Sequence, residues 1–177
     1  MGCGIEALQE EDVATLQTGE PEPCGTRAVL GAGTGLGEGI LIWQGDHYRA
    51  LPSEGGHVDF APADEDQDGL LQFLRPIFGH VSYERILSGA GLVKIFEYLI
   101  ASGRETPSSS LRQAMLDLDP ATAISGHGLD GRDPAAVRAL DMFIAIYGAQ
   151  AGNLALTTLA KGGVYVRAEL RPKLFPV

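Results

Sequence analysis

Apolar runs in the first third of the chain are short and are separated by glycine-rich and polar turns. The runs at 28–30, 40–43 and 47–51 are interrupted by a glycine loop at 31–37 and by polar residues at 44–46. Short apolar runs bounded by such turns are typical of antiparallel strands. We therefore predict a three-stranded meander, which follows an acidic, glycine- and proline-containing lead-in at 1–25.

Beyond Pro52 the apolar residues recur in steps of three and four, which is the period of a helix. This spacing predicts four helices, at 70–78, from 83, at 92–99 and at 111–118. Pro76 should kink or end the first near Leu74, because proline cannot donate the helical hydrogen bond. Ser82 is expected to cap the second helix, and Gly103 is expected to stop the third.

The last predicted helix carries the clearest signals. Asp133 fits the N-cap and Pro134 the first helical residue, and apolar residues continue in steps of three and four as far as Thr158. Gly162 is expected to end this helix after about 40 Å. Residues 142–160 carry no charge, but polar residues are spread along them and the flanks lack basic clusters, so a buried core helix is favoured over a membrane span.

A further strand at 163–166 follows this helix, so the order of elements indicates an α/β arrangement. The chain has 177 residues, of which 45% are hydrophobic and 20% charged, which suits one globular domain rather than a disordered chain. The net charge of −10 argues against nucleic-acid and anionic-membrane partners. Cys3 and Cys24 suggest neither a disulfide framework nor a metal site, and a reducing cytoplasm fits them best.

The glycine loop at 31–37 is the first segment that can carry chemistry. Glycines let backbone N–H groups approach an anion, and Thr34 adds a hydroxyl donor. It is not a Walker loop, because no Lys-Ser or Lys-Thr follows, and Leu36 stands where a dinucleotide fingerprint needs glycine. The residues alone are equally consistent with a phosphate loop and with a hairpin that binds nothing.

The second segment places Glu54 and His57 on either side of two glycines. Unusual backbone dihedral angles at these glycines would let both side chains converge on a polyhydroxylated ligand, and the alternative is an exposed polar turn. Glu84 lies in the first turn of a predicted helix, where by itself it is better explained by the helix dipole.

Together these segments resemble bacterial-type glucokinase. The matching stretches, in family order and spacing, are 30–37, 54–62, 79–89, 152–156 and 162–165. The resemblance spans nearly the whole chain. It implies that 26–177 are the large-lobe portion of a ribonuclease-H-like, actin-like ATPase fold with a mixed sheet and packed helices, and that 1–25 are a lead-in remnant.

The resemblance implies that ATP, with Mg²⁺, phosphorylates glucose to glucose 6-phosphate at the start of glycolysis, in the cytoplasm. It assigns phosphate contacts to Gly31, Gly33, Thr34 and Gly35, and glucose contacts to Glu54, His57 and Glu84. A homodimer is the expected assembly, and no metal-ligating side chain is assigned.

The sequence also departs from the family pattern. In the family, the catalytic Asp follows an Asn just upstream of a segment that matches 2–5, so we expect no catalytic residue in this sequence. No Asp-x-Gly-Gly-Thr phosphate loop is present either. Arg167 and Glu169 replace small residues against which adenosine packs in the family, so we expect ATP binding to be weakened or lost. The same two residues disfavour a general nucleotide-binding scaffold.

From these departures we expect the small lobe and the closing C-terminal segment to be absent, and the chain alone to transfer little phosphate. The alternatives are a catalytically inactive sugar-binding or dimerising remnant, and the product of a misassigned start codon.

Overall fold

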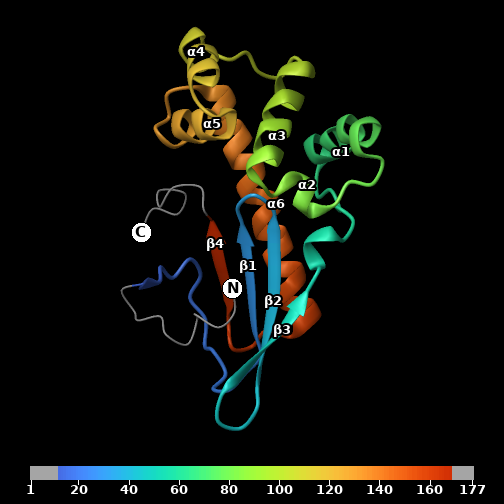
Figure 1. The fold of residues 1–177 in the computed structure, drawn as a ribbon, viewed down its shortest axis with the longest axis vertical. Coiled ribbons are helices and arrows are strands. Elements are labelled where there is room, and N and C mark those ends of the chain that lie inside the picture. The colour runs from blue at the N-terminus through green and yellow to red at the C-terminus, as the bar shows by residue number, and fades with distance from the viewer. Residues whose placement is uncertain (1–11, 169–177) are drawn as a thin grey trace.

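Four strands form one mixed sheet within residues 12–168, which are the residues that this computed structural model describes. They are β1 (Arg27–Ala32), β2 (Leu36–Trp43), β3 (Tyr48–Ser53) and β4 (Val164–Ala168), arranged in the order β3-β2-β1-β4 (Figure 1). The first three are antiparallel neighbours, and Ala32 pairs with Leu36 where the glycine loop joins β1 to β2. β4 runs parallel to β1 and places Arg167 opposite Gly31. The predicted meander and the predicted last strand are confirmed.

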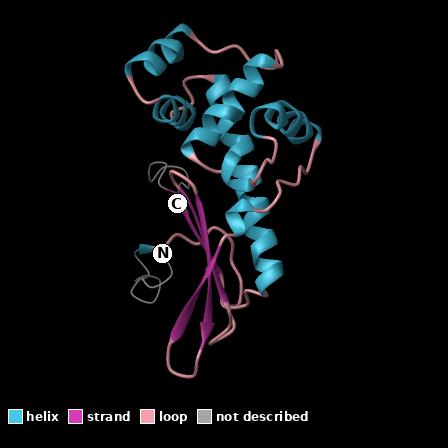
Figure 2. Ribbon diagram, turned by 45° about the vertical axis from the view of Figure 1, so that its right-hand side comes forward, coloured by secondary structure: helices cyan, strands magenta, loops and turns pink. Residues whose placement is uncertain are grey.

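Between β3 and β4 the chain forms a short 3-10 turn and the helices. These are η3 (Gly55–His57), α1 (Glu65–Phe78), α2 (Tyr83–Ile86), α3 (Gly89–Ala101), α4 (Ser109–Asp117), α5 (Pro120–Leu129) and α6 (Pro134–Thr158). α6 contacts α3 and α5 near its start and the strands β1 and β4 farther along. Figures 1 and 2 show it running from the helical end of the molecule down along one face of the sheet.

Two predicted helix ends are wrong. α1 continues through Pro76 to Phe78, because the proline lies in the last turn, where its missing N–H deprives only the Gln72 carbonyl of a helical donor. α6 ends because Leu159 adopts a left-handed conformation with φ of 49°, and not at Gly162. Gly162 has a different purpose, since a Cβ at that position would collide with the backbone of Gly25.

One helix was not predicted, and one cap differs from its prediction. α5 begins with the same Asp-Pro signal as α6, and the side chain of Asp119 accepts a hydrogen bond from the Thr122 N–H at 3.0 Å. The pair Asp119 and Pro120 could have identified it. Ser82 does occupy the N-cap of α2, but its side chain makes no capping hydrogen bond.

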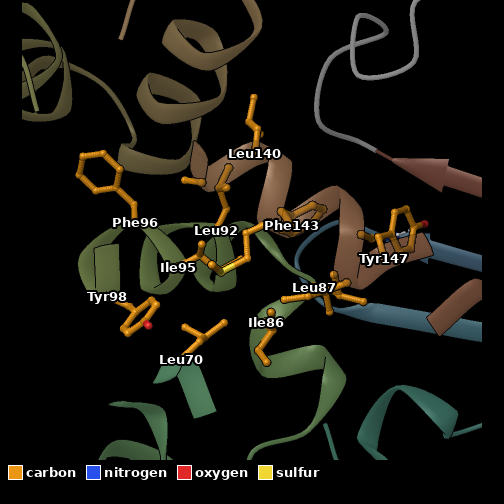
Figure 3. Close-up of a cluster of buried hydrophobic side chains, with 14 of the residues drawn as sticks. Leu70, Ile86, Leu87, Leu92, Ile95, Phe96, Tyr98, Leu140, Phe143 and Tyr147 are labelled. Atoms are coloured by element: carbon orange, nitrogen blue, oxygen red, sulfur yellow. Dashed lines mark hydrogen bonds between the residues drawn. The ribbon is translucent and has the colours of Figure 1, made fainter. Parts of the chain in front are cut away.

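The hydrophobic core lies where α3 and α6 cross, with additional side chains from α1 and α2. Figure 3 shows Leu92 of α3 facing Leu140 and Phe143 of α6, with Leu87 beside them, and all four are buried. α6 is therefore a core helix, as predicted. Within the part of the chain that the structure describes, none of the helices has the length and apolar character that crossing a membrane requires.

A single tyrosine hydroxyl joins α6 to the end of the parallel strand pair. The hydroxyl of Tyr147 accepts from the Ala32 N–H at 3.2 Å and lies 2.6 Å from the carbonyl of Arg167, to which it donates. The Leu30 carbonyl is 3.1 Å away. Burial raises the pKa of Tyr147 to about 12, so the phenol keeps its proton and remains a donor.

Replacing Tyr147 by Phe takes this hydroxyl away from Ala32 and Arg167. We expect the free energy of unfolding to fall by about 1–3 kcal/mol, the usual cost of losing buried hydrogen-bond partners. Tyr98→Phe is the matched control, because the Tyr98 hydroxyl is buried and has no hydrogen-bond partner among the described residues. Its removal should leave stability unchanged or slightly higher. Urea denaturation compares the two variants, and equal losses would contradict the role given to Tyr147.

Asp133, the N-cap of α6, joins that helix to the start of α4. It is 0% exposed, and its carboxylate accepts from the Ala136 N–H at 3.0 Å and from the Ser108 N–H at 2.8 Å. Burial by itself raises the pKa of the Asp133 carboxyl. Hydrogen bonds from Ser108 and Ala136 outweigh that effect and hold the pKa below its ordinary value of 3.8.

A lowered folded-state pKa means that ionised Asp133 stabilises the fold above about pH 4, and that this stabilisation is lost as the pH falls through the lowered value. Asp133→Asn keeps a capping side chain but removes the charge. We expect it to cost about 1–2 kcal/mol at pH 7 and less at pH 3. Asp119→Asn, at the exposed N-cap of α5, serves as the control and should cost less at both pH values. A loss for Asp133→Asn that is the same at pH 7 and pH 3 would refute this expectation.

Candidate functional site

Backbone pairing between residues 58–60 and 81–83 brings two predicted site segments together. The Phe60 N–H donates to the Val81 carbonyl at 2.9 Å, and the Tyr83 N–H donates to the Val58 carbonyl at 3.2 Å. The rings of Phe60 and Tyr83 pack edge to face with centroids 5.5 Å apart. Since His57 precedes one segment and Glu84 follows the other, the pairing places these two residues side by side.

The three side chains predicted to bind sugar converge. His57 Nε2 lies 3.6 Å from Glu54 Oε2, and His57 Nδ1 lies 3.6 Å from Glu84 Oε1. The side chains of Glu54 and His57 are largely exposed, whereas that of Glu84 is 33% exposed. Carboxylates accept hydrogen bonds from hydroxyls and an imidazole can donate or accept, so this arrangement suits a ligand with several hydroxyl groups.

Glu84 also holds the glycine loop. Its Oε2 accepts from the Leu36 N–H at 3.2 Å, and a Cβ on Gly35 would lie 2.6 Å from that same oxygen. On its other side the loop is tied to the start of α3, because the Gly89 N–H donates to the Gly33 carbonyl at 3.0 Å. One carboxylate therefore connects the predicted phosphate loop to the predicted sugar-binding residues.

The two glycines between Glu54 and His57 provide room rather than unusual dihedral angles, which corrects the prediction. The described glycines with positive φ are Gly45, Gly79, Gly103, Gly131 and Gly163. At Gly55 a Cβ would collide with the carboxylate of Glu38, and at Gly56 it would collide with the Leu36 carbonyl. Close packing against β2 explains both glycines.

Both sets of candidate residues face one open hollow of about 400 Å³. Its lining includes the four predicted phosphate contacts, Gly31, Gly33, Thr34 and Gly35, together with Glu54 and Glu84. His57 does not line it, but it lies within 3.6 Å of both of these carboxylates. A larger hollow of about 690 Å³ between α1 and α6 contains none of the predicted residues.

Further residues line the smaller hollow. Glu38 and Ser53, which pair across β2 and β3, were not predicted. Glu38 could have been noticed in the sequence, because an acidic side chain within a predicted strand needs a hydrogen-bond or charge partner. Arg167, expected to crowd the nucleotide, also lines the hollow, whereas Glu169 lies outside the described residues.

Across residues 12–168, no group of three or more His, Cys, Asp or Glu side chains is arranged to hold a metal. Cys24 is exposed and carries a free thiol, and Cys3 and the segment 2–5 lie outside the described residues.

Comparisons with known proteins agree on one family. The family model described as Glucokinase matches residues 1–177. A glucokinase of Nostoc sp. (strain PCC 7120) is 42% identical over 190 residues, which cover 100% of this chain and 56% of the relative. The chain thus spans about half the length of the curated relatives it matches.

Solved structures show the same fold. The crystal structure of glucokinase from an Antarctic psychrotroph matches with a TM-score of 0.79 at 29% sequence identity. The match covers 94% of this chain and 49% of the psychrotroph chain. Glucokinase from Balamuthia mandrillaris, in complex with glucose, matches with a TM-score of 0.72 at 23% sequence identity. That match covers 93% of this chain and 43% of the Balamuthia chain. The predicted fold class, the actin-like ATPase fold, is confirmed.

Replacing Gly35 by Ala tests the link between Glu84 and the glycine loop. The new methyl group would displace the Glu84 carboxylate from the Leu36 N–H, but the flexible end of that side chain can move. We therefore expect a small loss of stability, within about 1 kcal/mol, together with a shifted and faster-exchanging Leu36 amide signal in NMR. Gly152→Ala is the control: no atom lies within 4 Å of the added Cβ, so it should stabilise α6 by about 0.5–1 kcal/mol. An unchanged Leu36 signal in Gly35→Ala would show that the link is absent.

Proposed function

This chain belongs to the glucokinase family, and from that premise we propose that it forms the sugar-binding and phosphate-binding part of an enzyme that transfers a phosphoryl group from ATP to glucose. The product is glucose 6-phosphate, at the start of glycolysis. The observation that carries the proposal is the convergence of Glu54, His57 and Glu84 beside a hollow that the glycine loop also lines. Residues 26–177 correspond in this proposal to the large-lobe portion of the enzyme.

The sugar is held by hydrogen bonds from its hydroxyl groups. Glucose hydroxyls donate to the carboxylates of Glu54 and Glu84, and His57 between them donates or accepts. Glu84 is the best oriented of the three, because the Leu36 N–H binds its Oε2 and leaves Oε1 facing His57. A carboxylate fixed before the sugar arrives loses less conformational entropy on binding.

The phosphoryl group lies at the glycine loop, which lines the same hollow. The exposed hydroxyl of Thr34 and the backbone at Gly35 are the groups proposed to contact its oxygens. Phosphoryl transfer depends mainly on positioning and on stabilisation of charge, and a shared hollow brings the donor phosphate close to a sugar hydroxyl. Magnesium is proposed to accompany ATP, by the family resemblance alone.

The whole enzyme's activity is inferred from relatives that are about twice as long. Glucose in the Balamuthia mandrillaris structure supports glucose as the sugar. A homodimeric assembly and a cytoplasmic location are proposed from the family resemblance alone.

Isothermal titration of the 177-residue chain with glucose tests the sugar site. Glu84→Gln removes the charge while keeping the size of the side chain, and hydrogen bonds to charged groups contribute about 1.5–3 kcal/mol. We expect the dissociation constant to rise about tenfold or more. Glu97→Gln, which alters a half-exposed ion pair with Lys94 on α3, should leave it within about twofold. Equal glucose binding by Glu84→Gln and the unmodified chain would exclude Glu84 from the site.

A further inference from the structure

A series of side-chain hydrogen bonds runs behind the sugar-binding residues, from β2 through α6 to α2. The Glu38 Oε1 accepts from the Gln150 Nε2 at 2.7 Å, and the Gln150 Oε1 accepts from the Asn153 Nδ2 at 3.3 Å. The same Asn153 amide donates to the Tyr83 hydroxyl at 3.2 Å. We call these four residues the relay. The proposed function assigns a role to none of them, although Glu38 lines the hollow.

Each end of the relay touches a segment that carries sugar-binding residues. At one end, the Glu38 carboxylate fills the space where a Cβ of Gly55 would lie, in the turn between Glu54 and His57. At the other end, Tyr83 immediately precedes Glu84 in α2. The relay therefore connects, through α6, the segment that carries Glu54 and His57 with the segment that carries Glu84.

Burial makes the hydrogen bonds of Gln150, in the middle of the relay, specific. Gln150 is 4% exposed, so its amide must be paired inside the protein, and an unpaired buried polar group costs about 1–3 kcal/mol. The Glu38 carboxylate is a charged acceptor, which gives a shorter and stronger hydrogen bond than a neutral one. Gln150 thus restricts the Glu38 side chain to one orientation, with its second oxygen against Gly55.

We propose that Glu38 and Gln150 are positioning residues of the sugar site. They hold the Gly55–His57 turn at the distance from α2 that lets His57 lie between Glu54 and Glu84. The inference rests on the proposed function in one respect, which is that the ligand is glucose. Glu38 also lines the hollow, so a direct contact between its carboxylate and the sugar is the competing outcome.

Three variants separate these outcomes. Gln150→Glu sets two carboxylates against each other, which raises their coupled pKa values and repels Glu38 from its place. The double variant Glu38→Gln with Gln150→Glu reverses the polarity of the bond and restores it, while residue 150 still accepts from Asn153. Gln113→Glu is the control. It creates the same kind of repulsion with Asp117, whose carboxylate oxygens both lie 3.1 Å from the Gln113 amide, on the exposed surface of α4.

Glucose binding is measured by titration at pH 7.5 and pH 5. We expect Gln150→Glu to weaken binding at least about tenfold at pH 7.5 and less at pH 5, where protonation relieves the repulsion. The double variant should return to within about threefold of the unmodified chain, and Gln113→Glu should not differ from it. Unchanged binding in Gln150→Glu would overturn the proposal. A double variant no better than the single one would instead assign Glu38 to direct sugar contact and also overturn it.

Amide hydrogen exchange without glucose provides a readout that does not depend on the proposed function. Positioning predicts faster exchange at residues 55–58 in Gln150→Glu and recovery in the double variant. If the unmodified chain binds no glucose, the proposed function is contradicted, but hydrogen exchange still tests the relay. Exchange at residues 55–58 that is unchanged in Gln150→Glu would overturn the positioning role of Glu38 and Gln150. If Gln150→Glu fails to fold at pH 7.5, Gln150→Leu, which removes the amide donor, replaces it in both measurements and should show the same weakened binding and faster exchange.

Discussion

The arrangement of this molecule depends on the attachment of α6 to the end of the parallel strand pair. The Tyr147 hydroxyl reaches both β1, through Ala32, and β4, through Arg167, at the point where the glycine loop begins. Toward its start, α6 packs on α3 and α5 (Figure 2). Because the same helix contacts both the strands and the other helices, its contacts set the position of the strand ends relative to α3 and α5. The glycine loop of the candidate site begins at these strand ends.

Close approach, rather than strained backbone, builds that site. Glycines at 35, 55 and 56 leave space for the Glu84 carboxylate, the Glu38 carboxylate and a backbone carbonyl. Each glycine thus marks a place where a second segment packs against the backbone. This kind of packing holds carboxylates in fixed positions before a ligand arrives, which is how a binding site reduces the entropic cost of ordering its own side chains.

Much of the fold could be predicted from the sequence because it rests on local signals. Glycine and polar turns marked the meander, and the Asp133-Pro134 cap marked α6. The failures were also local. Pro76 was tolerated because it lies in the last turn of α1, and α5 was missed although Asp119 and Pro120 carry the same signal as α6. Where a helix ends depends on whether other parts of the protein can satisfy the backbone groups that lose their helical hydrogen bonds. The sequence of the helix alone does not show this.

The sequence by itself determined the order of the strands, all the helices except α5, the family, and the residue types of the site, since these follow from periodicity and from motifs of contiguous residues. The tertiary structure decided how Glu54, His57 and Glu84 meet, and that Glu84 also holds Leu36. It alone revealed Glu38 and Gln150, which lie 112 positions apart in the chain. Such contacts arise from the pairing of distant segments and from buried polar groups that must find partners, and no local pattern encodes either.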